Sequence, residues 1–355
     1  MELVTGVALA GVGTGLAVYV ARTKHPERQR ALLREALRIA LATGVPLALA
    51  IAIAAPIYAD ALSEEKLAPI VFALSAAAGW AAVVPGLVNN YWLGQQRRGF
   101  MLALALASAA LSLIAAGLAP SAFILHMVIV CQALPALVLL FVADPDGPKP
   151  RFRARSHPLR RYVLPGLAIG ILGPMSMLLA RGAIGEALSW HEAGVLQSLW
   201  RLSDWVCVFA GGILSVHYLP RFAEARSGPR LFTAMGEAAS AVLLPSAMVF
   251  VALFLFHRPL LALLYDPVFQ ASDAAVGLFF AGSLMRIASW IPLFALYAMR
   301  RTRAITIGEL FSLPLFAASV MSLGEHVTLE AAGALWVAAY AAYGVFNLLA
   351  ARAAQ

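Results

Sequence analysis

Long apolar stretches separated by short polar ones run along almost the whole chain. Most of them reach the roughly 20 residues that a helix needs to cross a hydrocarbon core about 30 Å thick. The apolar runs are continuous rather than alternating, so the pattern favours helices over the strands of a membrane barrel. We predict eleven membrane helices, at residues 4–21, 37–59, 67–92, 100–118, 121–143, 161–182, 193–219, 232–256, 273–298, 303–323 and 329–351.

The connections between these spans alternate in charge. Arginines and lysines gather in every second connection, among them residues 22–38, 149–161 and 221–230. The connections between those are short and acidic or neutral. Positively charged connections of membrane proteins stay in the cytoplasm. The alternation therefore predicts a cytoplasmic C-terminus and, for the chain as given, an external N-terminus.

Composition supports a polytopic membrane protein. The chain is 62% hydrophobic and only 12% charged, with a mean hydropathy of +0.83, which is more apolar than one soluble core can hide. Its net charge of +8 is explained by topology, so we expect no nucleic-acid partner. Cys131 and Cys207 lie inside predicted helices and imply no disulfide framework. The histidines lack metal-ligand spacing and no glycine-rich phosphate loop follows a strand, so we predict no cofactor.

A proline- and arginine-rich segment divides the chain into two predicted bundles. We place five helices in residues 1–145, a cytoplasmic linker at 146–160, and six helices in residues 161–355, arranged around a central cavity. The two halves share spacing: Pro56 and Pro259, and likewise Arg97 and Arg300, are separated by the same number of residues. This offset predicts a parallel repeat, in which the span at 161–182 has a partner ahead of residue 1.

Polar residues at membrane depth are costly and usually face a cavity, so they are the first candidates for a site. Arg286 lies near the middle of the span 273–298. It could line a central cavity and bind an anionic substrate, or it could form a structural pair with a carboxylate of a neighbouring helix. Prolines such as Pro292 and Pro314 interrupt several spans, which indicates helices bent around a cavity.

A second group lies about two turns inside the span 193–219. Arg201 and Asp204 are three residues apart and share one helix face, so they either neutralise each other or both line the cavity. Burial could raise the pKa of Asp204 enough for it to carry a proton. Trp200 could stack on a sugar ring, although aromatic residues near a membrane interface commonly belong to its aromatic belt.

Two further charged residues complete the candidates. Glu309 lies inside the span 303–323, which the short turn at Arg300 places beside the helix of Arg286. It could couple transport to protons or form a salt bridge within the bundle. Arg181 lies at the outer end of its span, where it could bind substrate or reach to the interface.

The run from Arg181 to Pro220 resembles the seventh-to-eighth helix region of O-antigen and enterobacterial-common-antigen lipid flippases. Those proteins have an arginine, a W-x-E-x-G-x-x-Q loop, an S-D pair and a Y-x-L-P motif. The corresponding residues of this chain are Arg181, Trp190, Glu192, Gly194, Gln197, Ser203, Asp204, and Tyr218 to Pro220 in altered form. The segments around Arg286 and Glu309 also look like this family, which belongs to the multidrug/oligosaccharidyl-lipid/polysaccharide (MOP) flippase superfamily.

The resemblance covers the chain except for the family's first helix, and it implies a transporter rather than an enzyme. A flippase of this family moves an undecaprenyl-diphosphate-linked oligosaccharide from the cytoplasmic to the periplasmic leaflet of the bacterial inner membrane. The partners implied are this lipid-linked glycan, membrane lipids and the glycan polymerase machinery. Arg286, Arg201, Arg181 and Trp200 would then bind substrate, with Asp204 and Glu309 as coupling or structural carboxylates. Two alternatives are a cation-coupled multidrug exporter of the same superfamily and a membrane glycan polymerase or ligase.

Overall fold

The structure is a computed structural model that describes residues 2–9, 12–23, 25–62, 79, 82–118, 124–143, 159–225, 228–265 and 267–353. Its regular secondary structure in these ranges is helical throughout. The described helices are α1 (Glu2–Leu9), α2 (Val12–Arg22), α3 (Pro26–Leu62), α5 (Val83–Gly94), α6 (Arg98–Leu118), α7 (Ile124–Ala143), α8 (Arg160–Ala187), α9 (Trp190–Ile213), the π-helical turn η2 (Leu214–Tyr218), α10 (Leu219–Ala225), α11 (Pro229–Leu255), α12 (His257–Leu264), α13 (Asp273–Met299), α14 (Thr302–Gly308), the 3-10 turn η3 (Glu309–Phe311), α15 (Leu313–Leu323), the 3-10 turn η4 (Gly324–His326) and α16 (Leu329–Arg352).

The predicted all-helical, polytopic membrane fold is confirmed. Eight helical segments in the described part of the chain are long and apolar enough to cross a membrane. A shorter apolar helix covers Met127–Leu140. Most of the predicted span at 67–92 lies outside the described residues, as does most of the predicted linker at 146–160.

The chain folds as two compact units, Met1–Ile171 and Leu172–Gln355, each with its own apolar core. In unit 1, α2 packs on α5 and α6 packs on α7. Here α3 begins at Pro26, well before the predicted start at residue 37, because Pro26 and Glu27 suit a first helical turn and the charged residues that follow are good helix formers. The stretch 26–38, predicted as a basic connection, is therefore helical.

In unit 2 the core is organised around Trp336 of α16, whose side chain is fully buried. Its ring stacks on Phe279 of α13 at 5.2 Å between centroids, and it meets Trp200 of α9 at 4.5 Å and Phe316 of α15 at 4.9 Å. The indole Nε1–H donates to Ser283 Oγ at 3.2 Å, so its one polar atom is satisfied. One side chain thus joins four helices.

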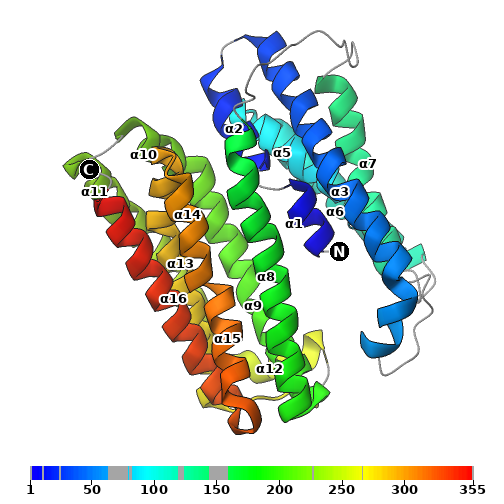
Figure 1. The fold of residues 1–355 in the computed structure, drawn as a ribbon, viewed down its shortest axis with the longest axis vertical. Coiled ribbons are helices and arrows are strands. Elements are labelled where there is room, and N and C mark those ends of the chain that lie inside the picture. Colours follow the sequence, from blue (N-terminus) through cyan, green and yellow to red (C-terminus); the bar gives the residue numbers. More distant parts are fainter. Residues whose placement is uncertain are drawn as a thin grey trace. The chain divides into compact units, whose positions relative to one another are not determined.

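Close contact between α13 and α16 depends on a glycine. The two helices run side by side in Figure 1 and share the most extensive contact between any two described helices. A Cβ atom at Gly282 of α13 would lie 2.2 Å from Cδ1 of Trp336 and 2.9 Å from the backbone nitrogen of Val337. Backbone cannot move aside as a flexible side chain can, so only glycine permits this approach.

The predicted span 303–323 is a broken helix rather than a continuous one. α14 ends at Gly308, the turn η3 covers Glu309–Phe311, and α15 starts at Leu313. Pro314 explains the break, because it has no N–H to donate and its ring excludes the carbonyl group four residues earlier. At the break, the Glu309 carbonyl accepts hydrogen bonds from the Ser312 hydroxyl at 2.7 Å and from the Ser312 N–H at 3.3 Å.

We expect Gly282→Ala to destabilise unit 2 by about 1–3 kcal/mol, because the added methyl group pushes against Trp336 and the α16 backbone. Thermal unfolding of the purified protein in detergent measures the change. Gly212→Ala in α9 is the matched control, since a Cβ there meets nothing within 4 Å and alanine favours helix. Equal stabilities of the two variants would contradict the close packing of α13 on α16.

Candidate functional site

Arg286 is the middle residue of the 27-residue helix α13, so its charge lies as far as possible from either end of the span. Its Nη1 donates to Oδ1 of Asp204, on α9, at 2.8 Å. The side chains are 17% and 27% exposed, respectively. The interaction is therefore a largely desolvated ion pair between two helices, and each partner offsets the cost of burying the other.

Aromatic rings surround the Arg286 guanidinium. Its Cζ atom lies 5.1 Å from the ring centroid of Trp290 and 5.9 Å from those of Trp200 and Tyr340. Because the face of an aromatic ring carries negative potential, each ring attracts the cation without removing one of its N–H donors. The three rings come from α13, α9 and α16, so the cage exists only when these helices are packed together.

Helix caps fix the register of the two helices that form the pair. The Ser189 side chain accepts a hydrogen bond from the backbone N–H of Glu192 at 3.1 Å, which starts α9 in the S-x-x-E pattern of a capping box. Ser272 accepts from the N–H of Ala275 at 3.2 Å and starts α13 in the same way. Because α9 and α13 begin at these caps, Asp204 and Arg286 each lie several turns inside their helix.

Glu309 forms a second polar cluster at the break between α14 and α15. Its Oε1 accepts a hydrogen bond from the Tyr343 hydroxyl at 2.6 Å, and its backbone oxygen accepts one from Ser312 at 2.7 Å. In the described part of the chain, none of the ion pairs involves Glu309. The salt bridge that was one reading of its sequence context is replaced by a hydrogen bond to α16.

Two tyrosines of α16 connect the clusters. Tyr340, which lies against Arg286, and Tyr343, which bonds Glu309, are one helical turn apart, with ring centroids separated by 6.2 Å. Both are almost fully buried. A continuous line of polar and aromatic groups thus runs through the core of unit 2, in the order Asp204, Arg286, Tyr340, Tyr343 and Glu309.

The remaining candidates lie outside this line. Arg201 is exposed. Burial raises the pKa of Tyr265, and the positive charge of Arg201 partly offsets this rise, so Arg201 lies near the connection between α12 and α13. Arg181 donates through Nη1 to Oε1 of Gln197 at 3.0 Å, which ties α8 to α9. Trp200 is only 5% exposed, with its ring against Trp336. The structure therefore brings Arg286, Asp204 and Trp200 together, while Arg201 and Arg181 lie elsewhere.

Tyr340, Tyr343 and Trp290 complete the site, and sequence reasoning did not select them. A spacing signal existed for Trp290, which lies one helical turn after Arg286 and so shares its face. Tyr340 and Tyr343 looked like ordinary apolar positions of the last span. Among the described residues, no group of three or more histidine, cysteine, aspartate or glutamate side chains could hold a metal ion.

A double-mutant cycle tests whether Arg286 and Asp204 act as a pair. We expect Asp204→Leu alone and Arg286→Met alone each to lower the free energy of unfolding by about 3 kcal/mol, because each leaves one buried charge uncompensated. Combining Asp204→Leu with Arg286→Met removes both charges and should recover most of that loss. Thermal unfolding in detergent provides the readout.

The control for this cycle is the exposed pair of Arg221 and Glu237, whose atoms are 3.1 Å apart and whose side chains are about half exposed. Glu237→Gln should cost less than about 1 kcal/mol. If the destabilisations of the two Arg286–Asp204 single variants simply add in the double variant, the two residues are not energetically coupled.

No protein-family model and no curated protein matches the sequence. Solved structures do. An inward-facing multidrug resistance MATE family transporter of the MOP superfamily matches with a TM-score of 0.74 at 15% identity, over 99% of this chain and 87% of that one. A MATE structure in complex with MaL6 matches with a TM-score of 0.78 at 14% identity, over 99% and 85%.

A MOP superfamily transporter from Pyrococcus furiosus, described as having a binding pocket of reverse polarity, matches with a TM-score of 0.74 at 14% identity, over 99% of this chain and 83% of that one. Identities this low establish a shared architecture rather than a shared substrate. The chain has the fold of MOP superfamily transporters.

Proposed function

We propose that the chain is a lipid flippase that moves an undecaprenyl-diphosphate-linked oligosaccharide from the cytoplasmic to the external leaflet of a bacterial inner membrane. The observation that carries the proposal is Arg286, an arginine at the centre of a membrane helix, held by one carboxylate and three aromatic faces. A guanidinium in such a place favours an anionic ligand. The motif resemblance between Arg181 and Pro220 supports the choice of ligand.

The hydrogen bonds that Arg286 makes in the protein leave N–H donors for a phosphate group. A guanidinium carries five N–H donors in a planar fork that matches phosphate oxygens. Within the described part of the chain, Asp204 is the one side chain that accepts a hydrogen bond from it, through Nη1. The aromatic rings orient the fork but take no donor. The remaining N–H groups are therefore available to the diphosphate.

Asp204 gives the site a way to release its substrate. While the site holds no substrate, the Asp204 carboxylate neutralises Arg286. This attraction offsets the free-energy cost of burying the guanidinium in a medium of low dielectric constant. Phosphate oxygens compete with Asp204 for the same guanidinium. Binding is thus an exchange of one anionic partner for another, which limits affinity and lets the diphosphate leave on the far side.

Movement of the substrate is proposed to follow alternating access, in which the binding site opens first to one side of the membrane and then to the other while the lipid tail stays in the bilayer. Multidrug resistance MATE family transporters with this fold have been solved in an inward-facing and in an outward-facing conformation. The division of this chain into two compact units fits such a motion. The glycan polymerase machinery would take up the product in the external leaflet.

Glu309 is the proposed coupling group. It lies at a break in a membrane helix, and its main partner is the neutral Tyr343 hydroxyl rather than an arginine. A carboxyl group without a cationic partner can gain and lose a proton with little rearrangement, whereas Asp204 is committed to Arg286. The two tyrosines between the sites provide a contact through which protonation at Glu309 could bias packing around Arg286.

A cation-coupled multidrug exporter is the second candidate, since the solved relatives include multidrug MATE transporters. Aromatic cages can bind cationic ligands. In this chain, however, the protein's own Arg286 occupies the cage, so a cationic substrate would meet a like charge. For the Pyrococcus furiosus transporter, reverse polarity of the pocket is likewise said to suggest a different function. We rank this candidate below the flippase, and a membrane glycan polymerase or ligase below both.

We expect Arg286→Ala to abolish surface glycan in a bacterial host that depends on this chain for flipping. Surface glycan is normalised to the amount of the variant in the membrane, because this substitution also leaves Asp204 without its partner. Arg286→Lys should retain a small fraction of activity, because an ammonium group keeps the charge but not the fork. Each lost charged hydrogen bond predicts a rate roughly 10- to 100-fold lower. Quantitative blotting of surface glycan measures the effect.

Arg303→Ala is the control for this experiment, since Arg303 is an exposed arginine at the start of α14. That variant should behave as wild type. Normal glycan levels in Arg286→Ala would refute the flippase assignment, and export of cationic dyes that survives the same substitution would favour the multidrug exporter.

We expect Glu309→Gln to uncouple transport from protons. In vesicles with an imposed pH gradient, the wild type should flip faster than it does without a gradient, whereas Glu309→Gln should run at one rate in both. Tyr343→Phe removes the hydrogen bond but keeps the carboxyl group, so it should shift the pH dependence and leave the gradient response in place. A full gradient response in Glu309→Gln would assign the coupling to another group.

A further inference from the structure

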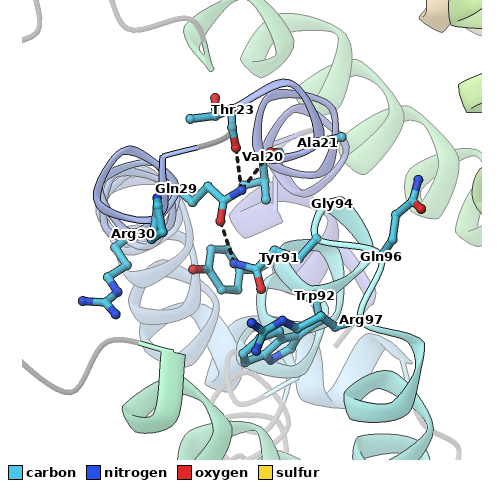
Figure 2. Close-up of a pocket in the computed structure, with 12 residues that line it drawn as sticks. Val20, Ala21, Thr23, Gln29, Arg30, Tyr91, Trp92, Gly94, Gln96 and Arg97 are labelled. Atoms are coloured by element: carbon cyan, nitrogen blue, oxygen red, sulfur yellow. Dashed lines mark hydrogen bonds between the residues drawn. The ribbon is translucent and has the colours of Figure 1, made fainter.

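A polar cavity lies in unit 1, and none of its lining residues belongs to the Arg286 site of unit 2. It has a volume of about 510 Å³, which is ample for a headgroup-sized ligand. Figure 2 shows its walls, which come from the end of α2, the start of α3 and the end of α5. The charge alternation of the sequence assigns both connections at this end to the cytoplasm. The residues that matter for its chemistry are Thr23, Gln29, Arg30, Trp92, Gln95 and Arg97.

A hydrogen-bond network on one wall fixes the orientation of two glutamines. Gln29 Nε2 donates to the backbone oxygens of Val20 at 3.3 Å and Thr23 at 2.6 Å. Gln29 Oε1 therefore has to act as an acceptor, and it receives a bond from Gln95 Nε2 at 2.8 Å. Gln95 Oε1 consequently points away from this network. It is buried and has no hydrogen-bond partner in the described part of the chain.

Trp92 provides the matching donor. Its side chain is 3% exposed, and its Nε1 atom is likewise buried with no hydrogen-bond partner in the described part of the chain. Trp92 and Gln95 are three residues apart at the end of α5, so they share one side of it. Buried polar groups rarely stay unpaired. An unpaired donor and an unpaired acceptor beside one cavity call for a ligand group that accepts and donates at once, which is the property of a hydroxyl.

The cavity also selects for negative charge. Two arginines, Arg30 and Arg97, line it, and none of its described lining residues is an aspartate or glutamate. A left-handed turn at Gln96, with φ of 55°, and a bond from the Arg97 N–H to the Trp92 carbonyl at 3.0 Å fold Arg97 back over α5. Its guanidinium then lies 5.5 Å from the Trp92 ring centroid and 5.7 Å from that of Phe100.

Arg97 is exposed, and none of the described carboxylates forms an ion pair with it. Its charge is therefore oriented by aromatic rings but not neutralised. Because it lies over the Trp92 ring, rotation of its side chain would uncover this ring at the cavity wall. The same rotation would bring its N–H donors to an anion held in the cavity.

We propose that this cavity binds the phosphate ester of a polyol, with the phosphate on Arg97 and Arg30 and a hydroxyl between Trp92 Nε1 and Gln95 Oε1. Such a group reaches the cytoplasmic surface from two sources. It is the headgroup of a glycerol-bearing anionic phospholipid in the inner leaflet, or it is a soluble phosphorylated polyol. The site is separate from the proposed transport path and does not depend on it.

The test measures the thermal unfolding midpoint of the full-length protein in nanodiscs of phosphatidylcholine, titrated with phosphatidylglycerol, with phosphatidylserine, or with soluble glycerol 3-phosphate. Ligands that bind the folded state raise the midpoint by mass action. Phosphatidylserine carries the same net charge as phosphatidylglycerol but has no hydroxyl groups. We expect phosphatidylglycerol to stabilise the wild type at concentrations about tenfold lower than phosphatidylserine.

Two variants separate the specific site from general attraction of basic loops to an anionic surface. Arg97→Gln removes the charge, and Trp92→Phe keeps the ring and the net charge but removes the Nε1 donor. Both should weaken the response about tenfold. Arg303→Gln and Trp205→Phe are the matched controls, since both side chains are exposed and neither lines the cavity. These controls should respond as wild type.

A midpoint shift with phosphatidylglycerol alone identifies a lipid site, and an equal shift with glycerol 3-phosphate identifies a soluble ligand. The proposal is overturned if neither ligand raises the midpoint, or if Trp92→Phe and Arg97→Gln respond as the wild type does. In those cases water forms the missing hydrogen bonds of Trp92 Nε1 and Gln95 Oε1, and Arg30 and Arg97 serve only to set the membrane topology. Flipping activity plays no part in this measurement, so its outcome is independent of the Arg286 assignment.

Discussion

Burying the guanidinium of Arg286 is the constraint on which the site in unit 2 depends. A charge at the middle of a 27-residue apolar helix is stable only if the surrounding protein replaces the solvation that it loses. Asp204 supplies an opposite charge at 2.8 Å, and three aromatic rings supply negative faces. Because these groups come from three helices, the charge and the packing of α9, α13 and α16 stabilise each other.

The aromatic core around Trp336 explains how that arrangement keeps its geometry. Trp200 lies against both Arg286 and Trp336, so one ring serves the charged site and the apolar core together. Gly282 lets α16 approach α13 closely enough for these contacts. Any movement of α16 would therefore alter the cage of Arg286 and, through Tyr343, the partner of Glu309. Shared contacts of this kind allow a change at one of these sites to alter the other.

The sequence was sufficient to predict the class of fold and the central arginine, because a charge inside an apolar run is visible in one dimension. It was not sufficient to predict which residue pairs with Arg286. Asp204 has Arg201 on its own helix three residues away, and spacing alone favoured that neighbour as much as a distant partner. Helical periodicity groups residues on a face but does not say which helix the face meets. The break at Glu309 has a local cause in Pro314, yet the partner across it, Tyr343, lies in another helix.

The cavity of unit 1 was missed for a different reason. Membrane topology accounts for the positive charges at Arg97 and around Arg30. The sequence pattern therefore gave no separate reason to expect a ligand there. Only the packed structure reveals that Trp92 Nε1 and Gln95 Oε1 have no hydrogen-bond partner among the described residues. The two basic sites then differ in a way that has consequences. Arg286 is already neutralised by Asp204, so the proposed ligand would have to compete for it and could be released. Arg97 lies over two rings and forms no ion pair with a described carboxylate, so an anion there would gain an unopposed charge interaction, which suits a ligand that stays bound.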